Sequence, residues 1–128
     1  MAKYVSSDVL DGGLNAIRNS AVRMLLLKAY TAGDSYATVT GNSICEVTMV
    51  SGDYALSGAD GAARVLTVAA KSGTSFAASG VTPDLHIAFT DGTSKVLLVT
   101  DETSDQEIAS GNTVNFPILT YTSSQPAP

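Results

Sequence analysis

The strongest pattern of apolar and polar positions lies in residues 85–100, where two alternating runs flank the pair Asp91-Gly92. Asp-Gly accommodates the positive φ angles of a two-residue type I′ turn, and alternation on both sides is typical of paired antiparallel strands. A two-residue turn would place Ile87 opposite Val96. The pattern therefore predicts a β-hairpin whose core-facing side carries Leu85, Ile87, Phe89, Val96 and Leu98.

The second face of this hairpin is polar near the turn, but farther from the turn it carries Leu97 and Val99. His86 lies on the same face, opposite Leu97 in the predicted register. A second apolar patch needs a cover of its own, which either the N-terminal segment or a neighbouring subunit could provide. We expect a neighbouring subunit, so His86, Leu97 and Val99 are candidate interface residues.

Other short runs rich in Val, Thr, Leu, Ile and Tyr alternate with Ser-Gly and Asp-Gly pairs after residue 50. Each pair is a plausible turn, and closely spaced turns between short runs are typical of antiparallel sandwiches and barrels. We predict a mainly β fold, an antiparallel β-sandwich or barrel-like domain. Its clearest strands are expected at residues 64–69, 85–90, 95–100 and 113–122.

The first half of the chain allows two interpretations. Its apolar positions follow helical spacing from Leu14 onward, whereas residues 22–27 also fit a strand that is buried on both faces. Because Asn19-Ser20 interrupts good helix formers, we favour a short helical turn at residues 14–18, followed by a strand at 21–30.

The length and apolar content indicate one domain, since 128 residues with 45% apolar side chains can bury a real core. We divide the chain into an N-terminal arm (residues 1–12), a single β domain (13–122) and a C-terminal tail (123–128), because neither end is regularly patterned. A second short helix, capped by Asp34 or Ser35, is expected before residue 40.

Charge and composition limit the possible partners. A net charge of −5 and a pI near 4.5 argue against nucleic-acid binding, because phosphate contacts need clustered Lys and Arg. Residues 1–28 hold four basic and two acidic residues, and the remainder holds three basic and ten acidic ones, so the arm could lie on an acidic body. We expect no membrane span and no secretory leader, and the lone Cys45 fits synthesis in a reducing cytoplasm.

No constellation of reactive side chains predicts an enzyme. Cys45 and His86 are the only residues of their kinds, and Cys45 lies in a strand-like run beside a carboxylate that would raise its pKa. The acidic run after the hairpin offers oxygen ligands for calcium but lacks the spacing of an EF-hand loop; it consists of Asp101, Glu102, Asp105 and Glu107. We therefore expect a solvated loop, no metal, no cofactor and no catalytic residue.

Three runs resemble small capsid decoration proteins of tailed bacteriophages, also called cement or head-stabilising proteins. They are Leu-His-Ile-Ala-Phe at 85–89, Val-Leu-Leu-Val-Thr at 96–100 and Ser-Gly-Asn-Thr-Val-Asn-Phe-Pro at 110–117. The resemblance implies a homotrimer on the outer surface of the phage head that contacts the major capsid protein and stabilises adjacent capsomers. It also implies synthesis in the host cytoplasm and a final location in the virion, with no nucleic-acid or membrane partner.

On this hypothesis the N-terminal arm reaches over the shell or a sister subunit through Lys3, Tyr4 and Val5. Together with the hairpin residues named above, these three complete the set of candidate interface residues. Two alternatives stay open: a phage tail or fibre component, and a glycan- or receptor-binding β-sandwich module. The second alternative predicts an exposed aromatic platform, although the chain has no Trp.

Overall fold

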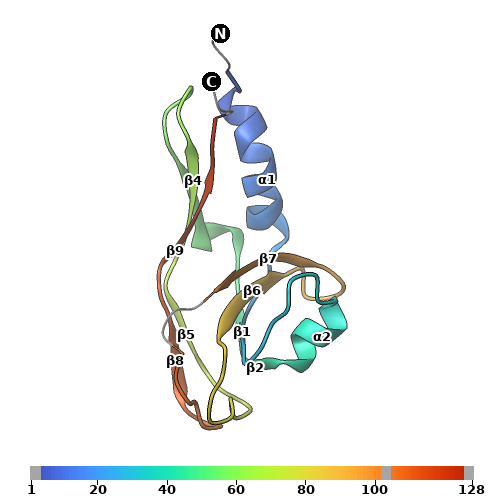
Figure 1. The fold of residues 1–128 in the computed structure, drawn as a ribbon. Coiled ribbons are helices and arrows are strands. Elements are labelled where there is room, and N and C mark those ends of the chain that lie inside the picture. The colour runs from blue at the N-terminus through green and yellow to red at the C-terminus, as the bar shows by residue number, and fades with distance from the viewer. Residues whose placement is uncertain (1–3, 102–104, 126–128) are drawn as a thin grey trace.

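The chain folds around a four-stranded antiparallel sheet in the computed structural model, which describes residues 4–101 and 105–125. The strands follow the order β2-β1-β6-β7. We call this sheet, together with helix α2, the body (Figure 1). Its elements are β1 (Arg23–Leu27), α2 (Tyr36–Gly41), β2 (Ser43–Thr48), β6 (His86–Thr90) and β7 (Val96–Asp101).

Strand β1 lies in the middle of the body and is buried on both faces, as its sequence predicted. Its even-numbered residues face the main core, whereas Leu25 and Leu27 pack in a smaller cluster with Val39 of α2. Helix α2 begins at the predicted cap, because Ser35 Oγ accepts a hydrogen bond from the Thr38 N–H at 3.2 Å. Each face of the body therefore has its own apolar cover.

A second sheet, of three strands in the order β3-β4-β9, extends from one end of the body and is covered on one face by helix α1 (Figure 1). We call α1 and this sheet the blade. A short 3₁₀ helix, η1 (Ser51–Asp53), leads into β3. The elements of the blade are α1 (Ser7–Ser20), β3 (Tyr54–Ser57), β4 (Arg64–Val68) and β9 (Leu119–Ser123).

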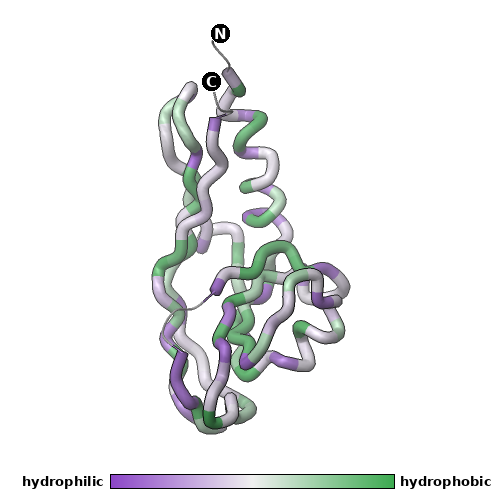
Figure 2. Tube along the Cα trace, in the orientation of Figure 1, coloured by the Kyte–Doolittle hydropathy of each residue, from purple (hydrophilic) through white to green (hydrophobic). Residues whose placement is uncertain are grey.

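Helix α1 is longer than predicted, so residues 7–12 belong to a helix and not to an arm. The sequence was misleading because Gly12 and Gly13 each weaken a helix by about 1 kcal/mol. The helix forms nevertheless, since a stripe spaced at three and four residues is buried against the core; it consists of Leu10, Leu14 and Ile17. Figure 2 shows the resulting alternation of hydrophobic and hydrophilic positions along α1.

A long two-stranded ribbon runs past the body, continuous with the blade. It consists of β5 (Lys71–Thr74) and β8 (Thr113–Phe116), which pair as β4 and β9 do. The register does not change at the break, because Val68 pairs with Leu119 and, three residues farther, Lys71 pairs with Phe116. The single strand predicted near the C-terminus is therefore split, since Pro117 lacks the N–H that a ladder requires.

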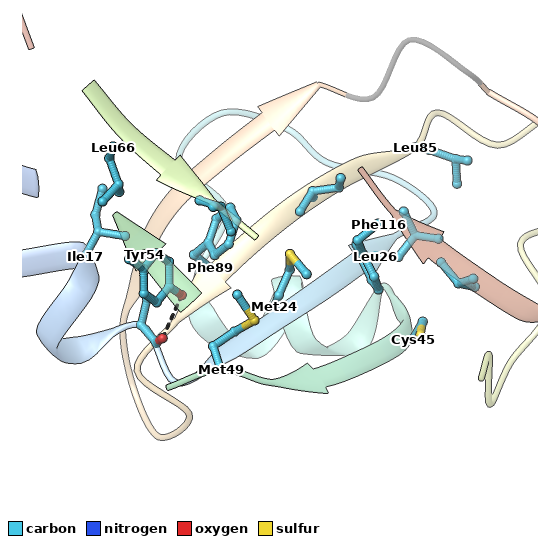
Figure 3. Close-up of a cluster of buried hydrophobic side chains, with 14 of the residues drawn as sticks. Ile17, Met24, Leu26, Cys45, Met49, Tyr54, Leu66, Leu85, Phe89 and Phe116 are labelled. Atoms are coloured by element: carbon cyan, nitrogen blue, oxygen red, sulfur yellow. Dashed lines mark hydrogen bonds between the residues drawn. The ribbon is translucent and has the colours of Figure 1, made fainter. Parts of the chain in front are cut away.

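One apolar core extends through the blade, the ribbon and the body (Figure 3). Leu66 of β4 and Phe89 of β6 belong to the same buried cluster. Tyr54 of β3 lies where the two regions meet: its ring is edge-on to Phe89 of the body, and its hydroxyl donates a hydrogen bond at 2.8 Å to the carbonyl oxygen of Ala21, the capping residue of α1. The centroids of these two rings are 6.3 Å apart.

The predicted hairpin forms from β6 and β7, but its turn and register differ from the prediction. Ile87 pairs with Thr100 and not with Val96, a shift of four residues along β7. Asp91 does not adopt the positive φ of a type I′ turn; among the described residues only glycines do. Instead, the Asp91 Oδ1 atom closes a longer loop by accepting three N–H hydrogen bonds, at 2.9, 2.8 and 2.9 Å, from Thr93, Ser94 and Lys95.

Most of the predicted core face survives, because the register shift is an even number of residues. The residues that pack in the main core as predicted are Leu85, Ile87, Phe89 and Leu98. A bulge between Phe89 and Thr90 moves Val96 to the cluster beneath α2 and Leu97 to the main core. The mainly β, antiparallel fold is confirmed, and the described sheets do not close into a barrel.

Candidate functional site

The outer face of the blade sheet, on the side away from α1, is a candidate contact surface. Side chains alternate across a strand, so residues that pair across β3, β4 and β9 share a face. One row of this face runs through Ala55, Thr67 and Thr120, and the next through Ser57, Val65 and Thr122. All six side chains are uncharged, and four of them, Ala55, Ser57, Thr120 and Thr122, are exposed.

The edge strands of the blade, β3 and β9, also carry no charged side chain. A sheet edge presents unpaired N–H and C=O groups, and proteins usually protect such edges with charge, proline or a bulge. The edges of the body are protected in this way: β2 carries Glu46, paired with Arg23 at 2.8 Å, and β7 ends at Asp101. The blade is therefore the region whose edges are suited to pairing with another chain.

The predicted arm residues contact their own chain at the tip of the blade, and Lys3 lies outside the described residues. Val5 exchanges two hydrogen bonds with the Gln125 side chain, at 2.9 and 2.8 Å. The Tyr4 hydroxyl donates to Asp60 Oδ2 at 2.7 Å, which raises the pKa of Tyr4 and lowers the pKa of Asp60. Because the Tyr4 side chain is still 60% exposed, it stays accessible to a partner.

The hairpin residues predicted to form a seam between subunits do not share one face. Val99 packs in the cluster beneath α2, whereas the bulge turns Leu97 toward the main core. His86 is half-buried, with its ring 5.4 Å from the ring of Tyr30. The chain itself therefore supplies much of the cover that we had expected from a neighbour, and it does so with Tyr30 and α2.

Cys45 and His86 lie too far apart in the sheet to act as a nucleophile and base. Strand β1 separates them, since Cys45 pairs with Leu26 and His86 pairs with Leu27, whose side chain points to the opposite face. Burial raises the pKa of the Cys45 thiol, which keeps it protonated and unreactive near neutral pH.

The acidic run predicted as a solvated loop is partly described. Asp105 Oδ1 accepts a hydrogen bond from the Leu85 N–H at 2.8 Å, which ties this segment to the start of β6. Glu102 lies outside the described residues. The carboxylates of Asp105 and Glu107 are not grouped with Asp101 closely enough for these residues to bind one metal ion together.

A cleft of about 450 Å³ lies between the ribbon and the body. It is lined by Leu26, Leu85, Gln106, Glu107, Ile108, Asn112, Thr113, Val114, Asn115 and Pro117. None of these side chains is aromatic, so the cleft itself offers no ring for stacking. The exposed aromatic side chains of the described residues, which the glycan-binding alternative requires, include Tyr4, Phe76 and Tyr121.

Comparisons with protein-family models, with curated protein sequences and with solved structures find no match for this chain. Within the described residues, neither α-helix is long and apolar enough to cross a membrane. Because the comparisons find no match, the function of this chain must be inferred from its own residues and geometry.

We did not predict the uncharged surface of the blade from the sequence, although the lack of charged residues in two of its strands is visible there. Tyr-Ala-Leu-Ser of β3 and Leu-Thr-Tyr-Thr-Ser of β9 contain no charged residue. Local sequence does not indicate that these two strands are edges, because that depends on their long-range pairing with β4.

Proposed function

We propose that this chain is a virion structural protein that decorates the outer surface of a phage head and stabilises the contacts between capsomers. The observation that carries the proposal is the uncharged outer face of the blade, bounded by two uncharged edge strands. Charged residues make up 15% of the chain, and none of them lies on this face or on its two edge strands. The blade instead carries its charges elsewhere, on α1, in the tip loop and at the start of β4, as Asp8, Asp11, Arg18, Asp60 and Arg64.

This surface is suited to packing against another protein. Threonine, alanine, serine and valine side chains are small and uncharged, so a flat partner can cover them without the cost of burying charge. The main-chain groups of β3 and β9 could in addition pair with an extended segment of a neighbour. The blade thus offers both a face and edges for assembly.

The proposed partners are the major capsid protein and two further copies of this chain in a homotrimer. A protein that binds the assembled shell stabilises it by mass action, and several modest contacts act together when the subunits are linked. The blade takes over the interface role first predicted for the hairpin, because the chain itself covers much of Val99 and Leu97. Tyr4, exposed at the blade tip, remains part of the proposed interface.

Binding to shells tests the proposal directly. Heads assembled from the major capsid protein encoded with this chain are mixed with purified chain and pelleted. The double variant Thr120→Lys/Thr122→Lys places two charges on the outer face of the blade, and Thr48→Lys places one on an exposed position of the body edge as a control.

The wild type and the Thr48→Lys variant should saturate the heads, and the double variant should bind at least tenfold more weakly. Equal binding by all three proteins would contradict a role of the blade in attachment. Absence of binding to heads, together with binding to purified tails, would instead favour the tail or fibre alternative.

A further inference from the structure

Three possible metal ligands meet where β6 begins and β7 ends (Figure 1). Asp84 precedes His86 by two residues, so both side chains point to the same side of the extended chain. Asp101 pairs with His86 directly across the two strands. One donor atom from each of the three residues lies within 4.8 Å of the other two.

A hydrogen bond to the main chain favours one tautomer of the neutral His86 ring. Its Nδ1 atom lies 3.1 Å from the main-chain oxygen of Asp84. A carbonyl oxygen has no proton to give, so Nδ1 must donate, and in the neutral ring the lone pair is on Nε2. The Nε2 atom, which carries this lone pair, lies 3.7 Å from Asp101 Oδ1. Metal-binding histidines are commonly oriented by this kind of second hydrogen bond.

Burial also limits the movement of His86. Its side chain is only 13% exposed and packs against Tyr30, whereas the carboxylates of Asp84 and Asp101 are 63% and 68% exposed. Neither carboxylate forms an ion pair with a lysine or arginine in the described part of the chain. A rigid nitrogen donor is thus flanked by two adjustable oxygen donors whose negative charges favour a divalent cation.

We propose that Asp84, His86 and Asp101 bind a divalent transition-metal ion, with zinc as the probe. In a tetrahedral zinc site, bonds of about 2.0–2.1 Å place neighbouring ligand atoms about 3.4 Å apart. His86 Nε2 lies 3.7 Å from Asp101 Oδ1, and the exposed Asp84 carboxylate, whose Oδ1 atom lies 3.9 Å from Nδ1, would rotate toward Nε2 to complete the set. The imidazole nitrogen favours zinc over calcium or magnesium, which prefer oxygen ligands alone. Three protein ligands leave a fourth position open to water or to another donor.

Such an ion would join the start of β6 to the end of β7 at the end of their ladder. The site is independent of the proposed attachment through the blade, because its residues lie at the start of β6 and the end of β7. Failure of either proposal therefore leaves the other standing.

Calorimetric titration of the untagged, chelator-treated chain tests the site. Zinc chloride should bind once per chain, and calcium chloride should not bind. The dissociation constant for zinc should rise at least tenfold in Asp84→Asn and in Asp101→Asn, whose exposed side chains can change without disturbing the fold. Asp8→Asn, which removes one negative charge from α1, should bind zinc as the wild type does.

A second readout excludes a different zinc ligand such as Cys45. Because His86 is the only histidine, its ring nitrogens can be followed by NMR, and zinc should shift the Nε2 resonance while Nδ1 keeps its proton. A wild type that binds no zinc would overturn the proposal. So would zinc binding that leaves the His86 resonances unchanged, or that is unaffected in both aspartate variants.

Discussion

The sheets of the body and of the blade differ in how their faces and edges are covered. The body covers its four-stranded sheet on both faces, with α2 on one side and the ribbon and blade on the other, and its edge strands carry charge. The blade covers one face of its sheet with α1 and leaves the other face and both edges uncharged. Both faces of the body sheet are thus covered, whereas the blade sheet leaves one uncharged face and two uncharged edge strands exposed.

The two regions should therefore respond differently to substitution. Changes in the body should mainly affect the stability of the chain. Changes on the outer face of the blade should leave the fold intact and affect assembly.

The largest loss of stability is expected for Phe89→Ala in the body. Phe89 is fully buried in the main core, and removing such a ring typically costs about 3–5 kcal/mol. Leu119→Ala in the blade should cost about 1 kcal/mol, because Leu119 is only half-buried. Urea denaturation measures both free energies of unfolding, and equal losses would contradict the difference in burial between these two side chains.

A smaller loss is expected where the two regions meet. Tyr54→Phe removes a buried hydrogen bond to the Ala21 carbonyl oxygen and keeps the ring contact with Phe89, so the free energy of unfolding should fall by about 1–2 kcal/mol. Unchanged unfolding of this variant would show that the hydroxyl does not help to hold β3 on the end of α1.

The same residue predicts a response to alkaline pH. Burial raises the pKa of Tyr54 well above its ordinary value, so above about pH 10 the unfolded chain loses this proton while the folded chain keeps it. The wild type should lose stability as the pH rises through that range, and Tyr54→Phe should lose less. If the free energies of unfolding of the two proteins fall equally as the pH rises, the Tyr54 hydroxyl is not kept protonated by burial in the folded chain.

A still smaller effect is expected at the hairpin loop. Hydrogen bonds from the N–H groups of Lys95, Ser94 and Thr93 lower the pKa of Asp91, so its carboxylate stabilises the fold at neutral pH. Asp91→Asn should unfold at a slightly lower temperature than the wild type at pH 7. The difference should shrink below about pH 4, where the unfolded chain takes up the proton. A difference that is constant from pH 7 to pH 3 would contradict a role for the charge.

The smallest effect on stability is expected on the outer face of the blade. Thr120→Lys changes an exposed side chain and should alter the free energy of unfolding by no more than about 0.5 kcal/mol. If the variant instead unfolds as readily as Phe89→Ala, the outer face is part of the fold and not a surface kept for a partner.

Local patterns predicted the elements of the body well. Alternation identified β6 and β7, and of the two predicted caps, Asp34 and Ser35, it is Ser35 that caps α2. The register failed because the loop is closed by the side chain of Asp91, and this interaction is not visible in the alternation of apolar residues. The four-residue shift places Asp101 opposite His86, where the sequence had predicted Leu97.

The blade was harder to predict, because its elements depend on contacts between distant segments. Helix α1 contains two glycines and forms because its apolar stripe packs on the core. Strands β4 and β9 are 50 residues or more apart in the chain, so only the fold shows that β9 is an edge. The candidate surface therefore emerges from the pairing of three strands and not from any motif.

Cryo-electron microscopy of heads that carry this chain is the most direct test of the role assigned to the blade. The proposal predicts density outside the shell in which the outer face of the blade, including Thr120 and Thr122, contacts the major capsid protein or a sister subunit. Density in which this face points to solvent, with the body alone in contact with the shell, would contradict it.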